Sequence, residues 1–138
     1  RSAVTEGERS GVEQVIATTG ESLWVEREAQ LDAVTALSGS GPAYVFFFLE
    51  AMTRAGVEMG LSATQAHRLA VGTFVGASEL ARASDEPPAV LRQRVTSKGG
   101  TTHAAITSME ADGVAERFAR ALHAACERAR ELGDEFGR

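Results

Sequence analysis

The chain has 138 residues, of which 43% are hydrophobic and 24% are charged, a composition typical of one soluble globular domain. Its formal net charge of −5 and the lack of basic runs argue against nucleic acid or an anionic membrane surface as a partner. A single cysteine, Cys126, excludes an intramolecular disulfide and a cysteine-based zinc site, and it fits a cytoplasmic protein without a membrane segment.

The first 30 residues contain a helical pattern followed by a short strand pattern. Residues 4–19 carry apolar side chains at helical spacing, and Gly20 follows as a stop signal. Leu-Trp-Val at 23–25 is typical of a β-strand. A helix followed by a strand is how an α/β domain commonly ends, so we expect residues 1–30 to be the tail of such a domain. The expected inner face of its helix consists of Val12, Val15 and Ile16.

The remaining residues, 31–138, show no alternating strand pattern. Ala, Leu, Glu, Arg and Met dominate, so this part of the chain should be entirely helical. A short helix over 33–37 is expected to break at the glycine-rich segment 38–41. That segment lacks the full GxGxxG spacing of a dinucleotide loop and follows no strand, so it is a weak phosphate motif.

Pro42 suits the first turn of a helix that we expect to reach about residue 58. Residues 43–49 of this helix, which include Tyr44 and three phenylalanines, are apolar on every side. Such a helix must be buried all round, so another helix or a second copy of the chain must cover the faces that its neighbours leave open.

The next helix is expected to start at a Ser62–Gln65 capping box and to end near residue 84. Gly72 and Gly76 stand four residues apart in it, and this spacing predicts a close approach of another helix. The predicted apolar stripe consists of Ala66, Leu69, Ala70, Thr73, Ala77, Leu80 and Ala81.

Two more helices flank the most informative stretch, and a long one closes the chain. Pro87-Pro88 should start a short helix to about residue 94, and a helix after residue 102 should end at Asp112-Gly113. The final helix is expected over 114–135. Its predicted stripe consists of Val114, Phe118, Leu122, Ala125 and Leu132.

The stretch between the two flanking helices is VTSKGGTT, residues 95–102. Its two adjacent glycines allow a positive φ and a close approach of a ligand, while hydroxyls of Ser97, Thr101 and Thr102 can cap the next helix. The unpaired N–H groups and the dipole of that helix favour a small anion such as a carboxylate or a phosphate. Turns of this composition often serve only as helix caps, so a purely structural role stays open.

The string VTSKGGTTHAAITSME resembles the signature of pyrroline-5-carboxylate reductases, and DAVTALSGSGPAY at 32–44 is similar to the segment that opens the C-terminal domain of that family. The resemblance runs from about residue 23 to the end. It implies a mainly α fold: a helical dimerisation domain like the C-terminal domain of 6-phosphogluconate dehydrogenase, preceded by the last helix and strand of an α/β Rossmann domain. We therefore expect a C-terminal fragment, with residues 1–30 as the tail of the dinucleotide-binding domain and 31–138 as a substrate-binding and dimerisation domain.

The resemblance also implies which residues form the site. The Thr102 hydroxyl is the implied catalytic contact, reaching the ring nitrogen of the substrate, and the carboxylate is bound around it. The implied substrate-binding residues are Ser97, Gly99, Gly100, Thr101 and Thr102. The implied neighbours of the nicotinamide end of NADPH or NADH are Ser38, Gly39, Ser40 and Gly41. The three histidines are too scattered for a metal site, and His103 is turned away from Thr102 by one helical step, so we expect no metal and a surface or packing role for His103.

The implied function is the reduction of 1-pyrroline-5-carboxylate to L-proline by hydride transfer from NAD(P)H. A cytoplasmic homodimer or larger homo-oligomer is expected to carry it out, and the fragment alone should be inactive because the dinucleotide fingerprint is missing. Two alternatives stay open: another imine or hydroxyacid reductase with a Rossmann and a helical domain, and a non-catalytic helical dimerisation module.

Overall fold

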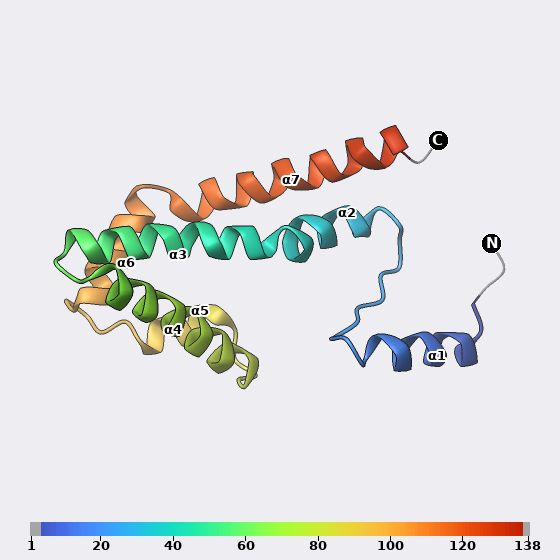
Figure 1. The fold of residues 1–138 in the computed structure, drawn as a ribbon, viewed down its shortest axis with the longest axis horizontal. Helices are drawn as coiled ribbons and strands as arrows, with labels where there is room; N and C mark the ends of the chain where they lie inside the picture. The colour runs from blue at the N-terminus through green and yellow to red at the C-terminus, as the bar shows by residue number, and fades with distance from the viewer. Residues whose placement is uncertain (1–3, 137–138) are drawn as a thin grey trace. The chain divides into compact units, whose positions relative to one another are not determined.

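The computed structural model describes residues 4–136, and this part of the chain contains helices and connecting segments but no β-strand (Figure 1). The chain divides into two compact units, Arg1–Leu31 and Asp32–Arg138. The expectation of a mainly helical fold is confirmed. In chain order the elements are α1 (Glu6–Ile16), α2 (Gln30–Val34), the π-helical turn η1 (Thr35–Gly39), α3 (Gly41–Glu58), α4 (Ala63–Arg82), α5 (Pro88–Arg94), α6 (Thr101–Ala111) and α7 (Val114–Phe136).

Helix α1 of the first unit begins at a capping box. The Glu8 amide donates to the Thr5 hydroxyl, and the Thr5 amide donates to the Glu8 carboxylate at 2.8 Å. These hydrogen bonds from Thr5 lower the pKa of Glu8 below its ordinary value. The helix ends at Ile16, earlier than predicted, and residues 1–3 of the predicted 1–30 segment lie outside the described residues.

The predicted strand at 23–25 is wrong. These residues form no strand, and Trp24 instead lies on α1, where its indole N–H donates to Glu13 and the Arg9 guanidinium lies 4.4 Å from its ring centroid. The predicted inner face of α1 is also uncovered, since Val15 is 70% exposed. Both differences have one cause: the described residues provide no sheet with which a strand could pair or on which α1 could pack.

The second unit opens with a π-helical turn where the sequence predicted a break. Helix α2 continues into η1, and the Ser40 amide donates to the Thr35 carbonyl five residues earlier at 2.9 Å. Pro42 occupies the first turn of α3, as predicted. The glycine-rich segment therefore continues the helix as a wider π-helical turn instead of interrupting it.

Helices α3 and α4 pack together through small residues. The Ser62–Gln65 capping box of α4 is confirmed, and Ala66 is buried against Gly56 of α3, where an added Cβ would lie 2.8 Å from the Ala66 Cβ. Gly72 and Gly76, where the sequence predicted the close approach of another helix, face open space within this chain, so that approach stays a prediction. The predicted stripe is only partly right: Ala66 and Ala70 are buried, whereas Leu69 is 60% and Leu80 is 67% exposed.

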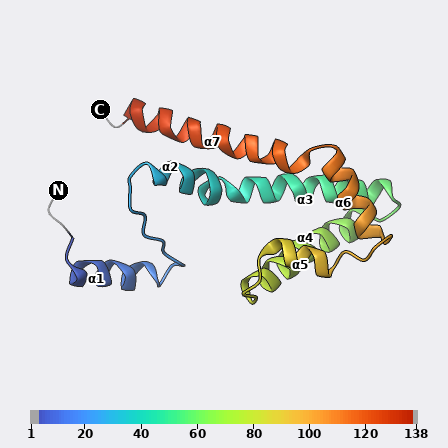
Figure 2. The ribbon, with the colours of Figure 1, turned by 180° about the vertical axis from the view of Figure 1, so that it is seen from behind.

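Helix α7 runs antiparallel to α3 and packs on η1 and the first turns of α3 (Figures 1 and 2). The Phe118 ring of α7 makes edge-to-face contacts with Tyr44 at 5.8 Å and with Phe48 at 5.5 Å between centroids. Phe118 and Leu122 of the predicted stripe are half-buried, while Leu132 is exposed.

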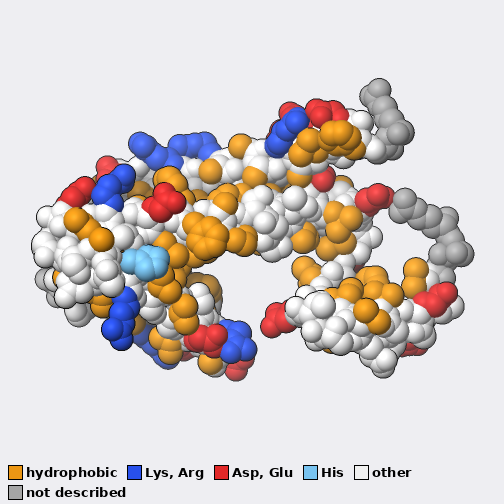
Figure 3. Space-filling model, viewed as in Figure 1, with side chains coloured by type: hydrophobic (Ala, Val, Ile, Leu, Met, Phe, Trp, Pro, Cys, Tyr) orange, Lys and Arg blue, Asp and Glu red, His pale blue; other side chains and the backbone are white. Residues whose placement is uncertain are grey.

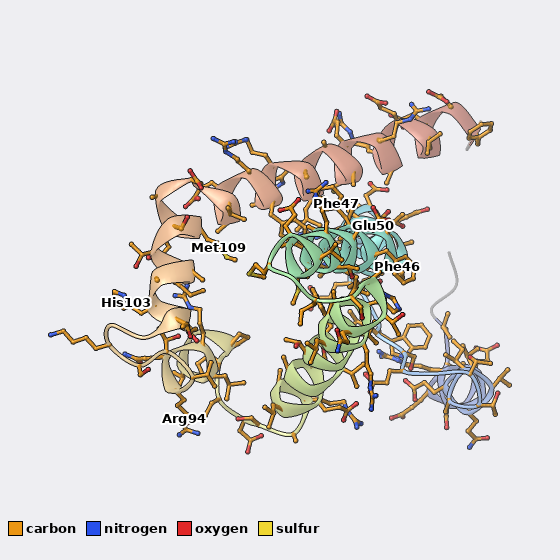
Figure 4. The ribbon with its side chains drawn as sticks, turned by 60° about the vertical axis from the view of Figure 1, so that its left-hand side comes forward. Phe46, Phe47, Glu50, Arg94, His103 and Met109 are labelled. Atoms are coloured by element: carbon orange, nitrogen blue, oxygen red, sulfur yellow. The ribbon has the colours of Figure 1, made fainter. Side chains whose placement is uncertain are left out.

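The apolar surface of α3 is only partly covered. Phe46 is 60% and Phe47 is 67% exposed, and the two rings lie on different sides of the helix (Figure 4). Figure 3 shows hydrophobic side chains gathered along α3 and toward α4. The expectation that its own neighbours would leave part of this helix open agrees with these exposures.

The contact between Gly56 and Ala66 gives a testable prediction. Gly56→Ala places a Cβ within 2.8 Å of the Ala66 Cβ, so the two helices must separate. We expect a loss of about 1–3 kcal/mol in the free energy of unfolding, measured by denaturant unfolding of the complete protein.

The matched control is Gly133→Ala. Gly133 lies within α7 with nothing near its Cβ position, so alanine should leave stability unchanged or raise it by up to about 1 kcal/mol. Equal effects of the two substitutions would contradict the close packing of α3 on α4.

Candidate functional site

The candidate site is the loop of residues 95–100 and the first turn of α6. Helix α5 ends where Thr96 turns back, since its hydroxyl donates to the Arg92 carbonyl at 2.7 Å and its amide to the Gln93 carbonyl at 3.1 Å. An exposed ion pair joins the two flanking helices, with the Arg92 guanidinium 3.3 Å from the Glu110 carboxylate. The hydrogen bonds of Thr96 thus fix the start of the loop, and the ion pair links the two helices that flank it.

A tight turn forms the centre of the loop. The Gly100 amide donates to the Ser97 carbonyl at 3.0 Å, and Gly99 has a φ of +74°. This is the pattern of a type II turn, in which the third residue must be glycine or asparagine and the second can be proline. Lys98, at the second position, is exposed and its side chain does not enter the turn.

Gly100 is needed at the start of α6 for a different reason. An added Cβ there would lie 2.6 Å from the Ser97 hydroxyl oxygen and 3.2 Å from the Ser97 carbonyl oxygen. The absence of a side chain at Gly100 therefore lets Ser97 fold back over the beginning of the helix.

The predicted capping of α6 by hydroxyls is wrong. Gly100 is the N-cap and provides no side-chain cap, because Thr101 and Thr102 already lie inside the helix and the Ser97 hydroxyl bonds to none of its amides in the described structure. The first α6 amide with a helical acceptor is that of Ala104, which donates to the Gly100 carbonyl at 3.1 Å. Within residues 4–136, the amides of Thr101, Thr102 and His103 have no protein acceptor.

The loop and the first turn of α6 therefore present several hydrogen-bond donors and contain no acidic side chain. Three N–H groups point out of a helix N-terminus, and the exposed hydroxyls of Ser97, Thr101 and Thr102 lie beside them. A helix start with this arrangement favours a carboxylate or a phosphate. The Gly100 amide is not available, because the turn uses it.

Two other residues of α6 take separate positions. Met109 points from α6 toward α3, and His103 lies on the outer side of the helix (Figure 4). His103 is exposed, in agreement with the surface role predicted for it. The described residues hold no group of three His, Cys, Asp or Glu side chains suited to a metal ion.

The second candidate segment, residues 38–41, forms the end of η1 and the start of α3. The Ser38 hydroxyl donates to the Val34 carbonyl at 2.9 Å, so it is already engaged, while an added Cβ at Gly41 would meet nothing within 4 Å. The segment borders an apolar hollow of about 490 Å³. Its lining includes Leu37, Ser38, Gly41, Pro42, Phe74 and Leu122. The backbone of the segment is therefore accessible from this hollow, and its predicted contact with the nicotinamide end of a dinucleotide stays a prediction.

The two candidate segments do not meet within one copy of the chain. Figures 1 and 2 place η1 and the α5–α6 loop at opposite ends of α3. The five predicted substrate residues form one continuous turn and helix start, but the predicted cofactor residues belong to a separate surface. A site that uses both segments needs a second copy or a further domain.

Comparison with known proteins identifies the family. The model described as "Pyrroline-5-carboxylate reductase dimerisation" matches residues 28–132. The chain belongs to the pyrroline-5-carboxylate reductase family. This confirms the resemblance found in the sequence.

Individual relatives agree with this assignment. The chain is 49% identical over 124 residues to the pyrroline-5-carboxylate reductase of Pseudomonas aeruginosa, covering 90% of this chain and 45% of that protein. Among solved structures, the Coxiella burnetii enzyme matches with a TM-score of 0.90 and 39% identity, over 96% of this chain and 49% of that one. The Plasmodium falciparum pyrroline carboxylate reductase, solved with NADP bound, matches with a TM-score of 0.86 and 32% identity, over 96% of this chain and 50% of that one. The chain spans about half the length of the relatives it matches.

The turn geometry gives a prediction for this reductase-family loop. Gly99→Ala puts a Cβ on a residue with φ +74°, which costs about 1–2 kcal/mol, whereas Gly99→Asn tolerates that conformation better. We expect Gly99→Ala to have the lower melting temperature of the two, measured by circular dichroism of the complete protein. Identical melting temperatures for the wild type and both variants would show that the turn is not held at this φ.

Proposed function

We propose that this chain is the substrate-binding and oligomerising half of an enzyme that reduces 1-pyrroline-5-carboxylate to L-proline with NADPH or NADH. The observation that carries the proposal is the start of α6, where three amides without protein acceptors lie beside the hydroxyls of Ser97 and Thr102. A planar cyclic imine with one carboxylate matches this donor set in size and charge.

In the proposed site, the α6 N-terminus binds the substrate carboxylate. The amides of Thr101 and Thr102 and the Ser97 hydroxyl donate to its oxygens, and the turn at Gly99 and Gly100 holds those groups in place. The Thr102 hydroxyl extends from the first helical turn toward the ring nitrogen. The nicotinamide cofactor supplies the hydride, so the chain's own task is to hold the imine carbon in a reactive orientation and to prevent unreactive orientations.

The cofactor is bound mainly by a dinucleotide-binding domain, of which residues 1–30 are the tail. The family relationship and the NADP in the Plasmodium relative support this part of the proposal. Residues 38–41 complete the nicotinamide end, where the open space at Gly41 allows the ring to approach. Residues 31–138 then form the substrate-binding and dimerisation domain.

The chain works as a homodimer or a larger homo-oligomer. The exposed Phe47 of α3 borders an apolar groove of about 510 Å³ between α3 and α7, and a second copy of the chain is the occupant that covers such a surface. Groove residues include Ala43, Phe47, Val114 and Ala121. Dimerisation also offers a way to bring the loop of one copy near the 38–41 segment of another.

Among the described residues, none of the helices has the length and apolar character needed to cross a bilayer. Action in the cytoplasm remains part of the proposal.

The role of Thr102 is tested by kinetics. In the complete enzyme, Thr102→Ala should lower kcat/KM for pyrroline-5-carboxylate by roughly 10- to 1000-fold, because one or two well-placed hydrogen bonds are lost at the reacting nitrogen. Circular dichroism should show an unchanged fold, since Thr102 is exposed on α6.

Lys98→Pro is the control within the same loop. Lys98 occupies the turn position that proline favours and its side chain takes no part in the turn, so this variant should keep kcat/KM within a few-fold of wild type. Wild-type kinetics for Thr102→Ala would remove Thr102 from the site. A panel of imines and 2-ketoacids assayed in parallel distinguishes this activity from that of a related imine or hydroxyacid reductase.

Oligomerisation is tested by sedimentation. The complete protein should sediment as at least a dimer at micromolar concentration, and Phe47→Glu should shift it toward the monomer because a charge would be buried at the interface. Phe136→Glu, the same change at an exposed phenylalanine in the last turn of α7, should leave the mass unchanged. A monomeric wild type would contradict the proposed assembly.

A further inference from the structure

The turn η1 leaves one backbone carbonyl without its ordinary helical partner. In an α-helix the Ala36 carbonyl would accept from the Ser40 amide, four residues later. In this structure the Ser40 amide donates to the Thr35 carbonyl at 2.9 Å, so it is not the donor to the Ala36 carbonyl. Ala36 is 3% exposed, and a buried carbonyl without a donor is costly.

The Tyr44 hydroxyl takes the place of that donor. It donates to the Ala36 carbonyl at 3.0 Å from the first turn of α3 and reaches back toward the N-terminus, as helical side chains do. The ring is half-buried and held edge-to-face against Phe118 at 5.8 Å. Tyr44 is the only tyrosine in the chain, and phenylalanine at this position would fill the same space without the hydrogen bond.

This contact decides between two registers of the same segment. With the hydroxyl present, both carbonyls have a donor in the π register: the Ser40 amide donates to Thr35, and the Tyr44 hydroxyl donates to Ala36. Without the hydroxyl, the Ala36 carbonyl loses this donor, which favours the α register in which the Ser40 amide donates to Ala36. That change removes one residue from the turn and rotates the segment that follows η1. Ser38, Gly39 and Gly41 lie at this point, so the register sets which of their groups face the hollow beside them.

We propose that Tyr44 is a positioning residue that holds the 38–41 segment in its π register for the nicotinamide end of the cofactor. The inference rests on the proposed function, because it takes residues 38–41 as the cofactor contact. Tyr44 itself touches neither substrate nor cofactor in this account, and its effect passes through the Ala36 carbonyl. Loss of the hydroxyl therefore weakens cofactor binding and leaves the distant α6 loop unaffected.

The test is Tyr44→Phe in the complete enzyme, with steady-state kinetics in which each substrate is varied in turn. We expect KM for NADPH to rise by roughly 3- to 10-fold, the effect of one neutral hydrogen bond, while KM for pyrroline-5-carboxylate stays within twofold of wild type. Hydrogen–deuterium exchange of the peptide that contains Ser40 should be faster in the variant, since its amide then shifts between the Thr35 and Ala36 carbonyls and opens more often.

Thr73→Val is the matched control. The Thr73 hydroxyl donates to the Leu69 carbonyl at 2.8 Å on the exposed surface of α4, so this change also removes one bond from a hydroxyl to a carbonyl but leaves η1 alone. It should change neither the KM for NADPH nor exchange at Ser40.

The outcomes separate the two proposals. If wild-type enzyme shows no NAD(P)H-dependent reduction of pyrroline-5-carboxylate, the proposed function is wrong and the role of Tyr44 falls with it. If wild-type enzyme is active, then an unchanged KM for NADPH in Tyr44→Phe, an equal rise in both KM values or a fall in kcat alone overturns only the role of Tyr44. Faster exchange at Ser40 without a change in the KM for NADPH also overturns it, because the turn would then have no effect on the cofactor.

Discussion

The structure depends on apolar surface that one copy of the chain cannot bury. Among the described residues only three hydrophobic side chains are buried, and all three are alanines: Ala36, Ala66 and Ala70. Burying a phenylalanine side chain contributes about 1.5–3 kcal/mol, and most of this is unrealised for Phe46 and Phe47 in a single copy. Association costs on the order of 4–15 kcal/mol in lost freedom, so several such side chains must be covered together to hold two copies. A broad apolar face on α3 is therefore a better basis for assembly than one or two isolated contacts.

Small residues set the close contacts that the chain does make for itself. Gly56 lets α4 approach α3, and Gly100 lets Ser97 fold over the start of α6. In both places the missing side chain brings backbone and neighbour within a distance that alanine would prevent. The contact at Gly56 holds α3 against α4, and the contact at Gly100 shapes the candidate site. A glycine in close contact with a neighbouring residue thus determines local geometry in both places.

The sequence predicted local features well where one residue type determines one geometry. The Ser62–Gln65 capping box, Pro42 in a first helical turn and the helix stop at Asp112-Gly113 all appear in the structure, because each depends on neighbours within four residues. The strand at 23–25 failed because strand formation needs a distant partner. The close contact at Gly56 was not predicted, because it depends on which face of α3 meets α4, whereas the predicted approach of another helix to Gly72 and Gly76 stays a prediction.

The candidate site was predicted to a similar extent and for similar reasons. The glycines and hydroxyls of 97–102 indicated an anion-binding helix start, and the structure contains that start, although the N-cap is Gly100 and not a hydroxyl residue. The roles of Thr102 and of residues 38–41 stay predictions. The π register of η1 had no signal in the sequence, since Ser-Gly-Ser-Gly-Pro is equally typical of a helix break. Its contacts come from residues that are distant in sequence: Tyr44, eight residues beyond Ala36, donates to the Ala36 carbonyl, and Phe118 of α7 packs on the Tyr44 ring. Phe118 of α7 thus both contacts Tyr44 and lines the apolar groove between α3 and α7, so one aromatic side chain borders the two features that the sequence pattern alone did not reveal.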